Sequence, residues 1–351
     1  MKLLHITDNL GSGGAELLLL QSIEKWIHTN PTIQHHVIAT YKGGALEKDF
    51  SAVTNYSILK FKKGILTIFK LRKFIRKNKI DVVHSHLFYS MIIARLAIPK
   101  SVKLISTYHS PIYLRSNMFY SKFHLLIDRL TLRKKHILIF VSEAVRKNVA
   151  EVLNIKKNKN YVIPNFCDKR FHPTYQFNTT PSLKLISVGN LKTEKNYLLA
   201  IEALGILNNP AISLDIYGEG YDRKNLEELI KKYNLGKNVF LKGSAKISSE
   251  LHANYDAFLM TSQFEGMPLA LIEALTSGLP VILNNLPELH ETAENAGIYF
   301  NTHSAQSLAE LLKKIIHEKL ILKKLSEQAL IISKKYTIEN YTSQLEKLYQ
   351  R

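Results

Sequence analysis

Residues 264–274 read Phe264-Glu265-Gly266-Met267-Pro268-Leu269-Ala270-Leu271-Ile272-Glu273-Ala274 and follow a short apolar run at 257–260. A run of this length and composition predicts a buried strand. Pro268 favours the first turn of a helix, because a residue there has no use for its backbone N–H. The sequence therefore predicts a strand, a loop and a helix that begins close to Pro268.

The predicted start of this helix has the features of a ligand site. Gly266 allows another group to approach the backbone closely, and the N–H groups of Met267, Leu269 and Ala270 lie at a helix N-terminus, which attracts anions. Glu265 and Glu273 flank this end and would repel a bare phosphate, so we expect them to accept hydrogen bonds from hydroxyl groups. A sugar nucleotide, with a diphosphate between two polyols, offers both kinds of group.

The spacing of Glu265 and Glu273 resembles the E-x7-E motif of the retaining family 4 glycosyltransferases. E-x7-E alone is also typical of an amphipathic helix with two solvated glutamates, but the likeness continues in Ser262, Gly266, Pro268, Leu271, Ala274 and Gly278-Leu279-Pro280-Val281. The resemblance implies an α/β protein of the GT-B fold, with two Rossmann-like parallel-sheet domains facing a central cleft. It also implies an enzyme of the bacterial polysaccharide or glycolipid type.

The order of the predicted elements agrees with two α/β domains. A chain of 351 residues is long enough for two cores. Repeated strand–helix alternation predicts parallel sheets, with strands expected at 2–7, 36–40, 57–59, 81–84, 103–107, 137–141 and 161–163, and again at 183–188, 213–217, 239–243, 257–260 and 280–283. The polar, aperiodic segment 171–181 is the predicted linker. We expect an acceptor-binding domain at 1–170 and a nucleotide-sugar-binding domain at 182–335, and the resemblance implies that the helix at 336–351 crosses back to the first domain.

Two features of the first half lie after predicted strands, where parallel sheets place their chemistry. Gly13 and Gly14 form a turn before a leucine-rich helix, and the resemblance implies that this turn lies under the donor's phosphates and sugar; a tight turn without a ligand is the alternative. His109 follows another strand and resembles the family's histidine near the C6 hydroxyl of the donor sugar. His84 and His86 also end a strand, where structural hydrogen bonding is the default expectation.

The second half contains the expected phosphate-binding residues. By resemblance, Lys195 holds the donor diphosphate, whereas Asn190 stands where the family has an arginine, so bidentate phosphate binding is lost. Lys192 is the nearest substitute. The expected donor-binding residues are Gly13, Gly14, Asn190, Lys195, Gly218, Gly243, Gly266, Met267, Pro268, Leu269 and Glu273, and the expected catalytic residues are His109 and Glu265.

No cofactor and no metal site are expected. The chain has no Asp-x-Asp pair for a donor-bound cation, and Cys167 is its only cysteine, which excludes a disulfide framework and favours a reducing, cytoplasmic setting. The first residues predict a strand and not a signal peptide. No apolar run approaches the roughly 20 residues that span a bilayer.

The charge is concentrated in the first half. Residues 1–175 hold 29 Lys and Arg against 10 Asp and Glu, whereas residues 176–351 hold 19 of each, so the whole net charge of +19 lies in the predicted acceptor domain. Nine cations without an acid occur at Lys60, Lys62, Lys63, Lys70, Arg72, Lys73, Arg76, Lys77 and Lys79, among the apolar residues Ile68, Leu71, Phe74 and Ile75. A second basic segment carries Phe119, Phe123, Leu126 and Leu130 at helical spacing.

Basic amphipathic helices of this kind favour attachment to an anionic membrane surface, on its inner face for a cytoplasmic enzyme. The alternative is that both apolar faces pack on the sheet while the charges are solvated. A membrane surface would present a polyprenyl-linked acceptor to the predicted acceptor domain.

The function expected from these features is retaining, metal-independent transfer of a hexose from a UDP- or GDP-linked sugar to a glycan or lipid-linked acceptor. Two alternatives remain open. A sugar-nucleotide epimerase of the same fold would need acid and base residues in place of an acceptor groove. A basic nucleic-acid-binding protein is disfavoured, since the aromatic residues are not interleaved with the basic runs as stacking platforms.

Overall fold

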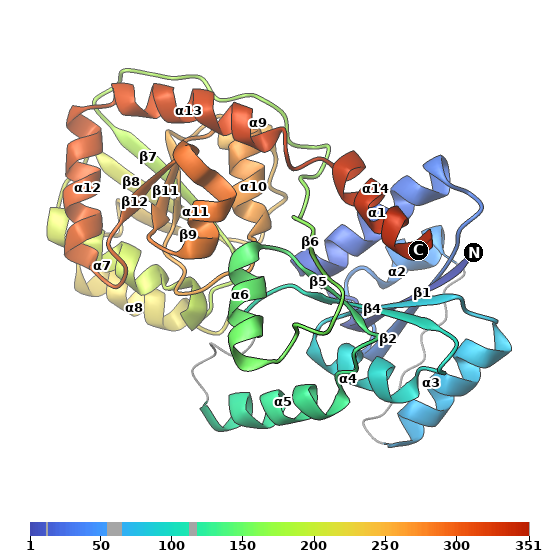
Figure 1. Ribbon diagram of the computed structural model, residues 1–351. Helices are drawn as coiled ribbons and strands as arrows, with labels where there is room; N and C mark the ends of the chain where they lie inside the picture. The colour runs from blue at the N-terminus through green and yellow to red at the C-terminus, as the bar shows by residue number, and fades with distance from the viewer. Residues whose placement is uncertain (12, 55–64, 112–117, 351) are drawn as a thin grey trace. The chain divides into compact units, whose positions relative to one another are not determined.

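The computed structural model describes residues 1–11, 13–54, 65–111 and 118–350. The chain forms two compact units (Figure 1). Unit 1 comprises Met1–Phe166 and Ile338–Arg351, and unit 2 comprises Cys167–Thr337. The strand expected at 57–59 and the cations Lys60, Lys62 and Lys63 lie outside the described residues.

Unit 1 is a six-stranded parallel sheet in the order β2-β1-β3-β4-β5-β6. Its strands are β1 (Lys2–Asn9), β2 (Gln34–Lys42), β3 (Val82–His86), β4 (Lys103–Tyr108), β5 (Ile137–Phe140) and β6 (Asn160–Val162). Its helices are α1 (Gly14–Thr29), α2 (Glu47–Val53), α3 (Ile65–Lys77), α4 (Phe88–Ala97), α5 (Met118–Thr131), α6 (Glu143–Val152) and α14 (Ile338–Gln350).

The two faces of this sheet differ in character, because successive side chains of a strand point to opposite sides. Leu4 and Ile6 of β1 belong to an apolar core that α3 and α4 cover. On the other face, His5 of β1 stacks against Trp26 of α1. Unit 1 therefore has one hydrocarbon face and one face rich in histidine.

The C-terminal helix α14 packs on unit 1. Tyr349 donates or accepts a 2.7 Å hydrogen bond with Nδ1 of His84, and Lys25 of α1 pairs with Glu339 at 2.8 Å. Both Tyr349 and Leu345 are buried. The last helix thus contributes to the histidine-rich face although it lies far from that face in the sequence.

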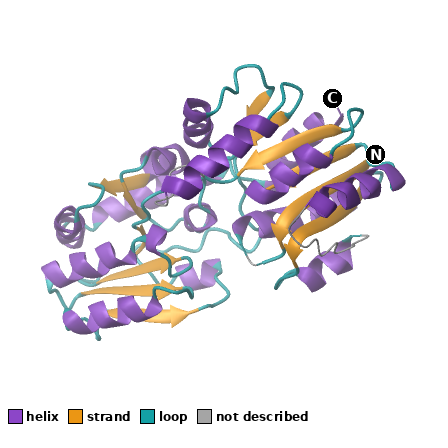
Figure 2. Cartoon of the chain, turned by 90° about the horizontal axis from the view of Figure 1, so that it is seen from below, coloured by secondary structure: helices purple, strands orange, loops and turns teal. Residues whose placement is uncertain are grey.

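Unit 2 is a second six-stranded parallel sheet, in the order β12-β11-β10-β7-β8-β9, with helices on both faces (Figure 2). Its strands are β7 (Leu183–Val188), β8 (Ile212–Tyr217), β9 (Val239–Gly243), β10 (Ala257–Met260), β11 (Val281–Asn284) and β12 (Gly297–Phe300). Its helices are α7 (Tyr197–Leu207), α8 (Arg223–Lys232), α9 (Ser249–His252), α10 (Leu269–Thr276), α11 (Pro287–Ala293), α12 (Ala305–His317) and α13 (Leu320–Ser333), with short 3-10 turns η2 (Thr193–Lys195) and η3 (Glu294–Ala296).

The predicted linker, 171–181, packs on unit 2, which comprises Cys167–Thr337. His172 N donates to Ser249 Oγ at 2.7 Å, and the N–H groups of Thr174 and Tyr175 both reach Ser277 O at 3.1 Å. The segment is polar and aperiodic because its hydrogen bonds run to neighbouring loops and helices instead of to a sheet. None of the helices in the described part of the chain combines the length and the apolar character needed to cross a bilayer.

Candidate functional site

The predicted residues fall into two groups, one in each unit. Unit 2 holds the predicted phosphate and hydroxyl ligands, and unit 1 holds Gly13, Gly14 and His109. Each group lies at the carboxyl ends of parallel strands, which is where open α/β sheets bind ligands.

In unit 2, the loop after β10 leads into α10 as the sequence predicts, with one difference. Pro268 is the N-cap residue with an extended backbone (φ −73°, ψ 125°), and the helix begins at Leu269. The reason is that the carbonyl of Pro268 accepts the first helical hydrogen bonds, from Leu271 N at 3.2 Å and Ile272 N at 3.3 Å, which is what an N-cap carbonyl does. The first N–H groups of α10 therefore belong to Leu269 and Ala270.

Lys195 and Glu265 meet at this end of the sheet. The Lys195 Nζ lies 2.6 Å from Oε1 of Glu265, and the side chains are 27% and 13% exposed. Lys195 ends η2 after β7, and Glu265 lies in the loop after β10. Because β7 and β10 are neighbouring parallel strands, their carboxyl ends share one edge of the sheet. A hydrogen bond from Thr261 Oγ1 to Lys195 O, 2.9 Å long, ties the two loops together.

A second carboxylate accepts a hydrogen bond from the backbone of Glu265. The backbone N–H of Glu265 donates to Oε1 of Glu288 at 3.0 Å. Glu288 is buried in α11, and this burial raises the pKa of its carboxyl group. Glu288 was not among the predicted site residues, although a polar residue shortly after β11 is a usable signal for this edge of the sheet.

Glu273 lies one turn inside α10 and is partly buried. Desolvation raises the pKa of its carboxyl group to about 7, with Asp168 acting in the same direction and Arg170 opposing it. Arg170 Nε lies 3.0 Å from Oδ1 of Asp168. The carboxyl group of Glu273 therefore changes charge close to neutral pH. The charged groups that act on it, Asp168 and Arg170, lie at the start of unit 2. Arg170 was missed because it lies far from Glu273 in the sequence.

Two of the predicted glycines of unit 2, Gly218 and Gly243, lie in turns that pack against one another. The N–H of Gly218 donates to Gly243 O at 2.9 Å, and a Cβ on Gly218 would lie only 2.0 Å from Gly189 O. Gly243 has a positive φ of 74°, which favours glycine. These turns after β7, β8 and β9 fit one another tightly. Asn190, beside them, is exposed.

In unit 1, His109 follows β4 and lies beside His86 of β3, with His86 Nδ1 and His109 Nε2 3.4 Å apart. Burial lowers the pKa of His109 to about 4, so its imidazole is neutral at physiological pH. A neutral imidazole can donate one hydrogen bond and accept another, which suits contact with a sugar hydroxyl.

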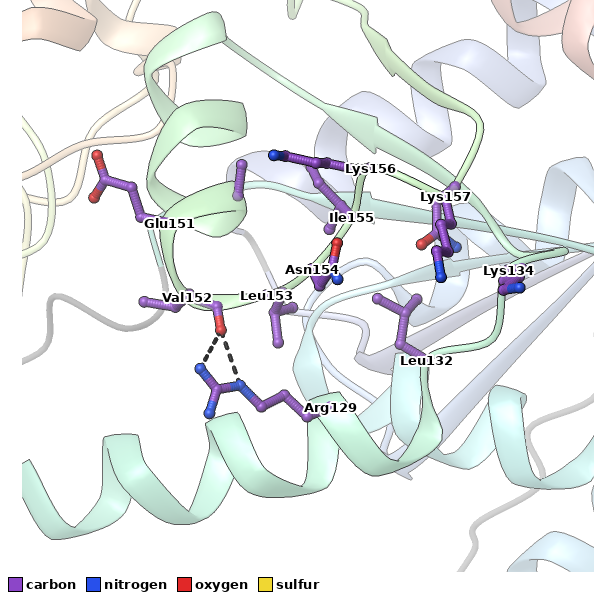
Figure 3. A pocket seen from close by; sticks show the side chains of 12 residues that line it. Arg129, Leu132, Lys134, Glu151, Val152, Leu153, Asn154, Ile155, Lys156 and Lys157 are labelled. Atoms are coloured by element: carbon purple, nitrogen blue, oxygen red, sulfur yellow. Dashed lines mark hydrogen bonds between the residues drawn. The ribbon is translucent and has the colours of Figure 1, made fainter.

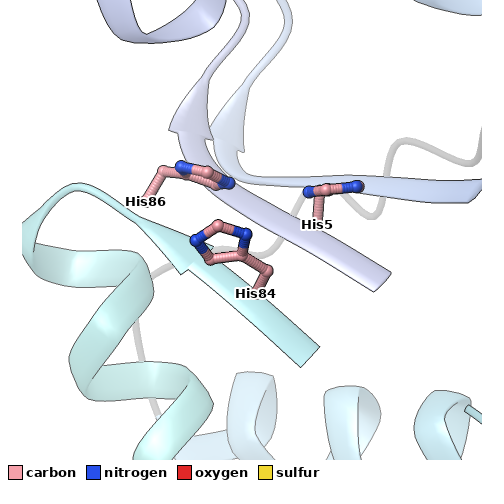
Figure 4. A group of neighbouring side chains, drawn as sticks. All are labelled: His5, His84 and His86. Atoms are coloured by element: carbon pink, nitrogen blue, oxygen red, sulfur yellow. The ribbon is translucent and has the colours of Figure 1, made fainter. Parts of the chain in front are cut away.

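His5, His84 and His86 form a buried group between β1 and β3, with ligand-capable atoms within 4.8 Å of one another (Figure 4). Burial lowers the pKa of each of the three well below the usual range. His84 already engages both ring nitrogens, with Tyr349 OH and Thr107 Oγ1, each at 2.7 Å. This histidine therefore has the structural hydrogen bonds expected for it, and it has no spare nitrogen for a metal ion.

The glycine turn after β1 is next to two acidic residues. Gly13 is the N-cap of α1, and a Cβ there would lie 2.5 Å from Oε2 of Glu16. Asp8 Oδ1 accepts hydrogen bonds from Ser90 N at 2.7 Å and Ser90 Oγ at 2.5 Å. Burial raises the pKa of both Asp8 and Glu16. Asp8 and Glu16 were not predicted as site residues, although they flank the turn at Gly13 and Gly14.

Comparison with known proteins shows which family this chain belongs to. Residues 13–171 match the family model described as Glycosyltransferase Family 4, and residues 170–331 match that of Glycosyl transferases group 1. The chain is 26% identical over 309 residues to the O-antigen biosynthesis glycosyltransferase WbnH of Escherichia coli, with 88% of each protein covered. It is 25% identical over 291 residues to an E. coli UDP-Gal:alpha-D-GlcNAc-diphosphoundecaprenol alpha-1,3-galactosyltransferase, covering 76% of this chain and 73% of that protein.

A solved structure has the same fold. The crystal structure of Anabaena HepE in complex with UDP superimposes with a TM-score of 0.84 at 17% identity, covering all of both chains. This likeness confirms the two-domain GT-B fold predicted from the sequence. Together with the two family matches, it identifies the chain as a glycosyltransferase of the GT-B fold.

Proposed function

We propose that this glycosyltransferase moves a hexose from a UDP- or GDP-linked sugar to a glycan or polyprenyl-linked acceptor, with retention of configuration, in the synthesis of a cell-surface polysaccharide. The observation that carries the proposal is the contact between Lys195 and Glu265 at the N-terminus of α10. A cation for phosphate and a carboxylate for hydroxyl groups lie side by side there, as a sugar diphosphate requires.

Lys195 and the first N–H groups of α10 would hold the diphosphate, since a helix N-terminus and an ammonium group both favour anions. Glu265 would accept a hydrogen bond from a donor-sugar hydroxyl and Glu273 would bind the ribose hydroxyls. Asn190 or Lys192 would take the place of the family's arginine. His109 of unit 1 would contact the donor sugar as a neutral imidazole.

The proposed reaction is a front-face displacement. The bond between the sugar C1 and the diphosphate oxygen breaks while the acceptor oxygen bonds to C1 from the same side. The departing phosphate oxygen takes the acceptor's proton, so no protein nucleophile is needed. Lys195 and the helix N-terminus stabilise the negative charge that develops on the leaving group, and preorganised donors of this kind contribute about 2.7–4 kcal/mol each.

The reaction would need neither a metal ion nor another cofactor, a proposal that rests on the lack of any Asp-x-Asp pair in the sequence. Two comparisons support the donor and the acceptor. HepE was crystallised with UDP, and the galactosyltransferase relative is named for a UDP-linked donor and a diphosphoundecaprenol-linked acceptor.

Attachment to the inner face of an anionic membrane is part of the proposal, and α5 supports it. Its inner side is polar: Asp128 is buried and pairs with Arg95, and Tyr108 OH donates to Asp128 Oδ2 at 3.0 Å. Its outer side is apolar, with Phe123 56% exposed and Leu130 75% exposed. An outward apolar face beside exposed cations is typical of a helix that lies on a membrane.

The apolar repeat of α3 behaves differently. Leu71 and Ile75 are buried in the core of unit 1, and Ile68 and Phe74 pack against it. The expectation that this repeat faces a membrane is therefore wrong, because α3 must bury one face on the sheet. Of the second segment, Phe119 lies outside the residues whose side chains are described.

A thermal-shift screen against UDP, GDP, ADP and their sugars tests the proposed donor class. We expect stabilisation by one nucleoside diphosphate and its sugars, since a ligand that binds only the folded state stabilises it. The Glu273→Ala variant should lose the shift. If no nucleoside diphosphate shifts the wild type, the proposed donor is wrong, and an RNA-dependent shift at physiological salt would favour the nucleic-acid alternative.

A further inference from the structure

Unit 1 has a basic cavity at the edge of its sheet where the strands begin, opposite the edge that holds His109. The cavity has a volume of about 720 Å³. It lies between the C-terminal ends of α3 and α4 and the segment that leads into β5. Five cationic side chains line it, at Arg72, Arg76, Lys79, Lys100 and Arg133, and its lining contains no acidic residue.

Four of these five cations have no partner among the residues that the structure describes. Arg72 is committed to structure, since its Nε donates to Ala97 O at 2.9 Å and its Nη2 to Leu96 O at 2.8 Å, at the C-terminus of α4. Among the described residues, the side chains of the other four make no ion pair and no hydrogen bond. A cation near the C-terminus of a helix stabilises the helix, because it interacts favourably with the negative end of the helix dipole. This effect applies to Arg72 at the end of α4 and to Arg76 in the last turn of α3. It does not explain why cations from three separate segments, with Lys100 and Arg133 among them, line one cavity.

The base of the cavity is apolar and buried. Ile75, Ile80 and Ile98 line it and are buried, and Ile80 N donates to Ile75 O at 3.1 Å. A concave site with a fixed apolar base and converging charges can hold a ligand in one place, whereas a flat basic surface cannot.

A second cavity, of about 590 Å³, extends the basic edge along α5 and the segment before β6 (Figure 3). Lys134 and Lys157 lie near one another on one side of it, and Glu151 lies at the opposite end. Arg129 Nε donates to Val152 O at 2.9 Å. The lining of this second cavity includes the acidic Glu151, whereas the lining of the first has no acidic residue, so the first is the better anion site.

Exposed apolar side chains continue the outer face of α3 away from the first cavity. Leu66 and Phe69 are 70% and 58% exposed, and with Lys73 and Arg76 they recur at intervals of three and four residues. Residues with this spacing share one face of a helix. The face is thus apolar at the start of α3 and basic at its end, where it reaches the cavity.

We propose that this cavity binds the phosphate of an anionic phospholipid headgroup, with Arg76, Lys79, Lys100 and Arg133 as its ligands. The uncompensated charge selects a phosphate-bearing anion, and Leu66 and Phe69 select one that carries acyl chains. The inference rests on the proposed attachment to a membrane and names the site that recognises it. Binding at a defined cavity differs from general attraction of a basic domain, because it depends on particular cations.

Two charge-matched variants test this difference. Arg76→Gln/Lys100→Gln removes two charges from the cavity, and Lys48→Gln/Lys147→Gln removes two exposed charges from α2 and α6. Co-sedimentation is measured with phosphatidylcholine vesicles that do or do not contain phosphatidylglycerol. We expect the cavity variant to lose about tenfold or more in partitioning to the anionic vesicles, and the control less than about twofold. Equal losses in both variants would overturn the site.

Calorimetry with inorganic phosphate and glycerol 3-phosphate separates a lipid site from a site for a free anion. Wild type that binds these soluble phosphates but sediments equally with neutral and anionic vesicles would overturn the lipid assignment. The melting temperature of each variant is measured by circular dichroism. A melting temperature equal to that of wild type shows that a loss of vesicle binding comes from the cavity and not from unfolding. None of these measurements uses a donor or an acceptor. If the lipid result holds and no nucleotide sugar binds, the proposed function fails while the headgroup site stands.

Discussion

Lys195 and Glu265, 70 positions apart in the sequence, form an ion pair of 2.6 Å at the edge of the unit 2 sheet. In our proposal the same two side chains bind the donor, the lysine through phosphate and the glutamate through a sugar hydroxyl. On donor binding, Lys195 would exchange Glu265 for a phosphate group, and Glu265 would exchange Lys195 for a sugar hydroxyl. The ion pair holds both groups in place before the donor arrives.

Lys195→Ala should abolish transfer and weaken binding of the nucleoside diphosphate by about 1.5–3 kcal/mol, the usual contribution of a hydrogen bond to a charged group. Titration calorimetry measures the loss. The matched control is Lys231→Ala on the exposed side of α8, which should bind as wild type does. In Glu265→Ala, binding of the diphosphate should persist while turnover falls. Near-normal transfer by both Lys195→Ala and Glu265→Ala would rule out this site.

Asn190→Arg should tighten binding of the nucleoside diphosphate, because an arginine adds a planar, bidentate phosphate donor that the chain lacks. Asn190 is exposed after β7, so the larger side chain has room. Calorimetry against the same diphosphate gives the change in affinity, and Asn190→Gln controls for side-chain length. An unchanged affinity in Asn190→Arg would place the diphosphate elsewhere.

Binding of the nucleotide sugar should strengthen as the pH rises through about 7. The pKa of Glu273 is raised to about 7 by burial, and only the ionised carboxylate accepts two ribose hydrogen bonds. Below that pKa, affinity should fall by up to about tenfold per pH unit, since protonation competes with binding. The intact sugar nucleotide is the probe, because its phosphates do not titrate in this range.

The same group has the opposite effect on folding stability. The pKa of Glu273 is higher in the folded state than its ordinary value of 4.5, so folding favours the protonated form. Its contribution to stability is present below pH 4.5 and is lost as the pH rises through about 7. Glu273→Gln should flatten both profiles. Identical binding profiles for wild type and Glu273→Gln would show that another group titrates.

Several elements follow from local sequence signals. The strand at 257–260 and the helix that begins next to Pro268 are where the sequence predicts them. The cap of α6 by Ser142, whose Oγ accepts from Val145 N at 3.2 Å, is a local feature of the same kind. These features depend on residues close together in the chain, such as an apolar run or a capping hydroxyl.

Features that depend on strand order were not predictable from one sequence. The contact of Lys195 with Glu265 requires β7 and β10 to be neighbours, although β8 and β9 lie between them in the chain. For a similar reason, the sequence left open whether the apolar face of α5 packs on the sheet or faces outward. Its amphipathic pattern did not show that Asp128 would be buried against Arg95.

The outer face of α5 should contribute to membrane binding by its apolar side chains. Phe123→Ser/Leu126→Ser/Leu130→Ser should lower sedimentation with anionic vesicles while leaving the melting temperature of unit 1 nearly unchanged, because all three side chains are at least 55% exposed. The control is Ile206→Ser/Ile331→Ser, two exposed apolar residues of unit 2. Unchanged sedimentation of the α5 variant at low and high salt would favour a soluble acceptor.

The most direct test of the central claim is to follow the anomeric protons by NMR while the enzyme is incubated with its nucleotide sugar alone, in the presence of EDTA. Slow transfer to water should release the free sugar first as the anomer present in the donor, at a rate that EDTA does not change. The Glu265→Ala variant should release it more slowly. First release of the inverted anomer, an epimerised sugar nucleotide, or loss of the reaction in EDTA would contradict retaining, metal-independent transfer at this site.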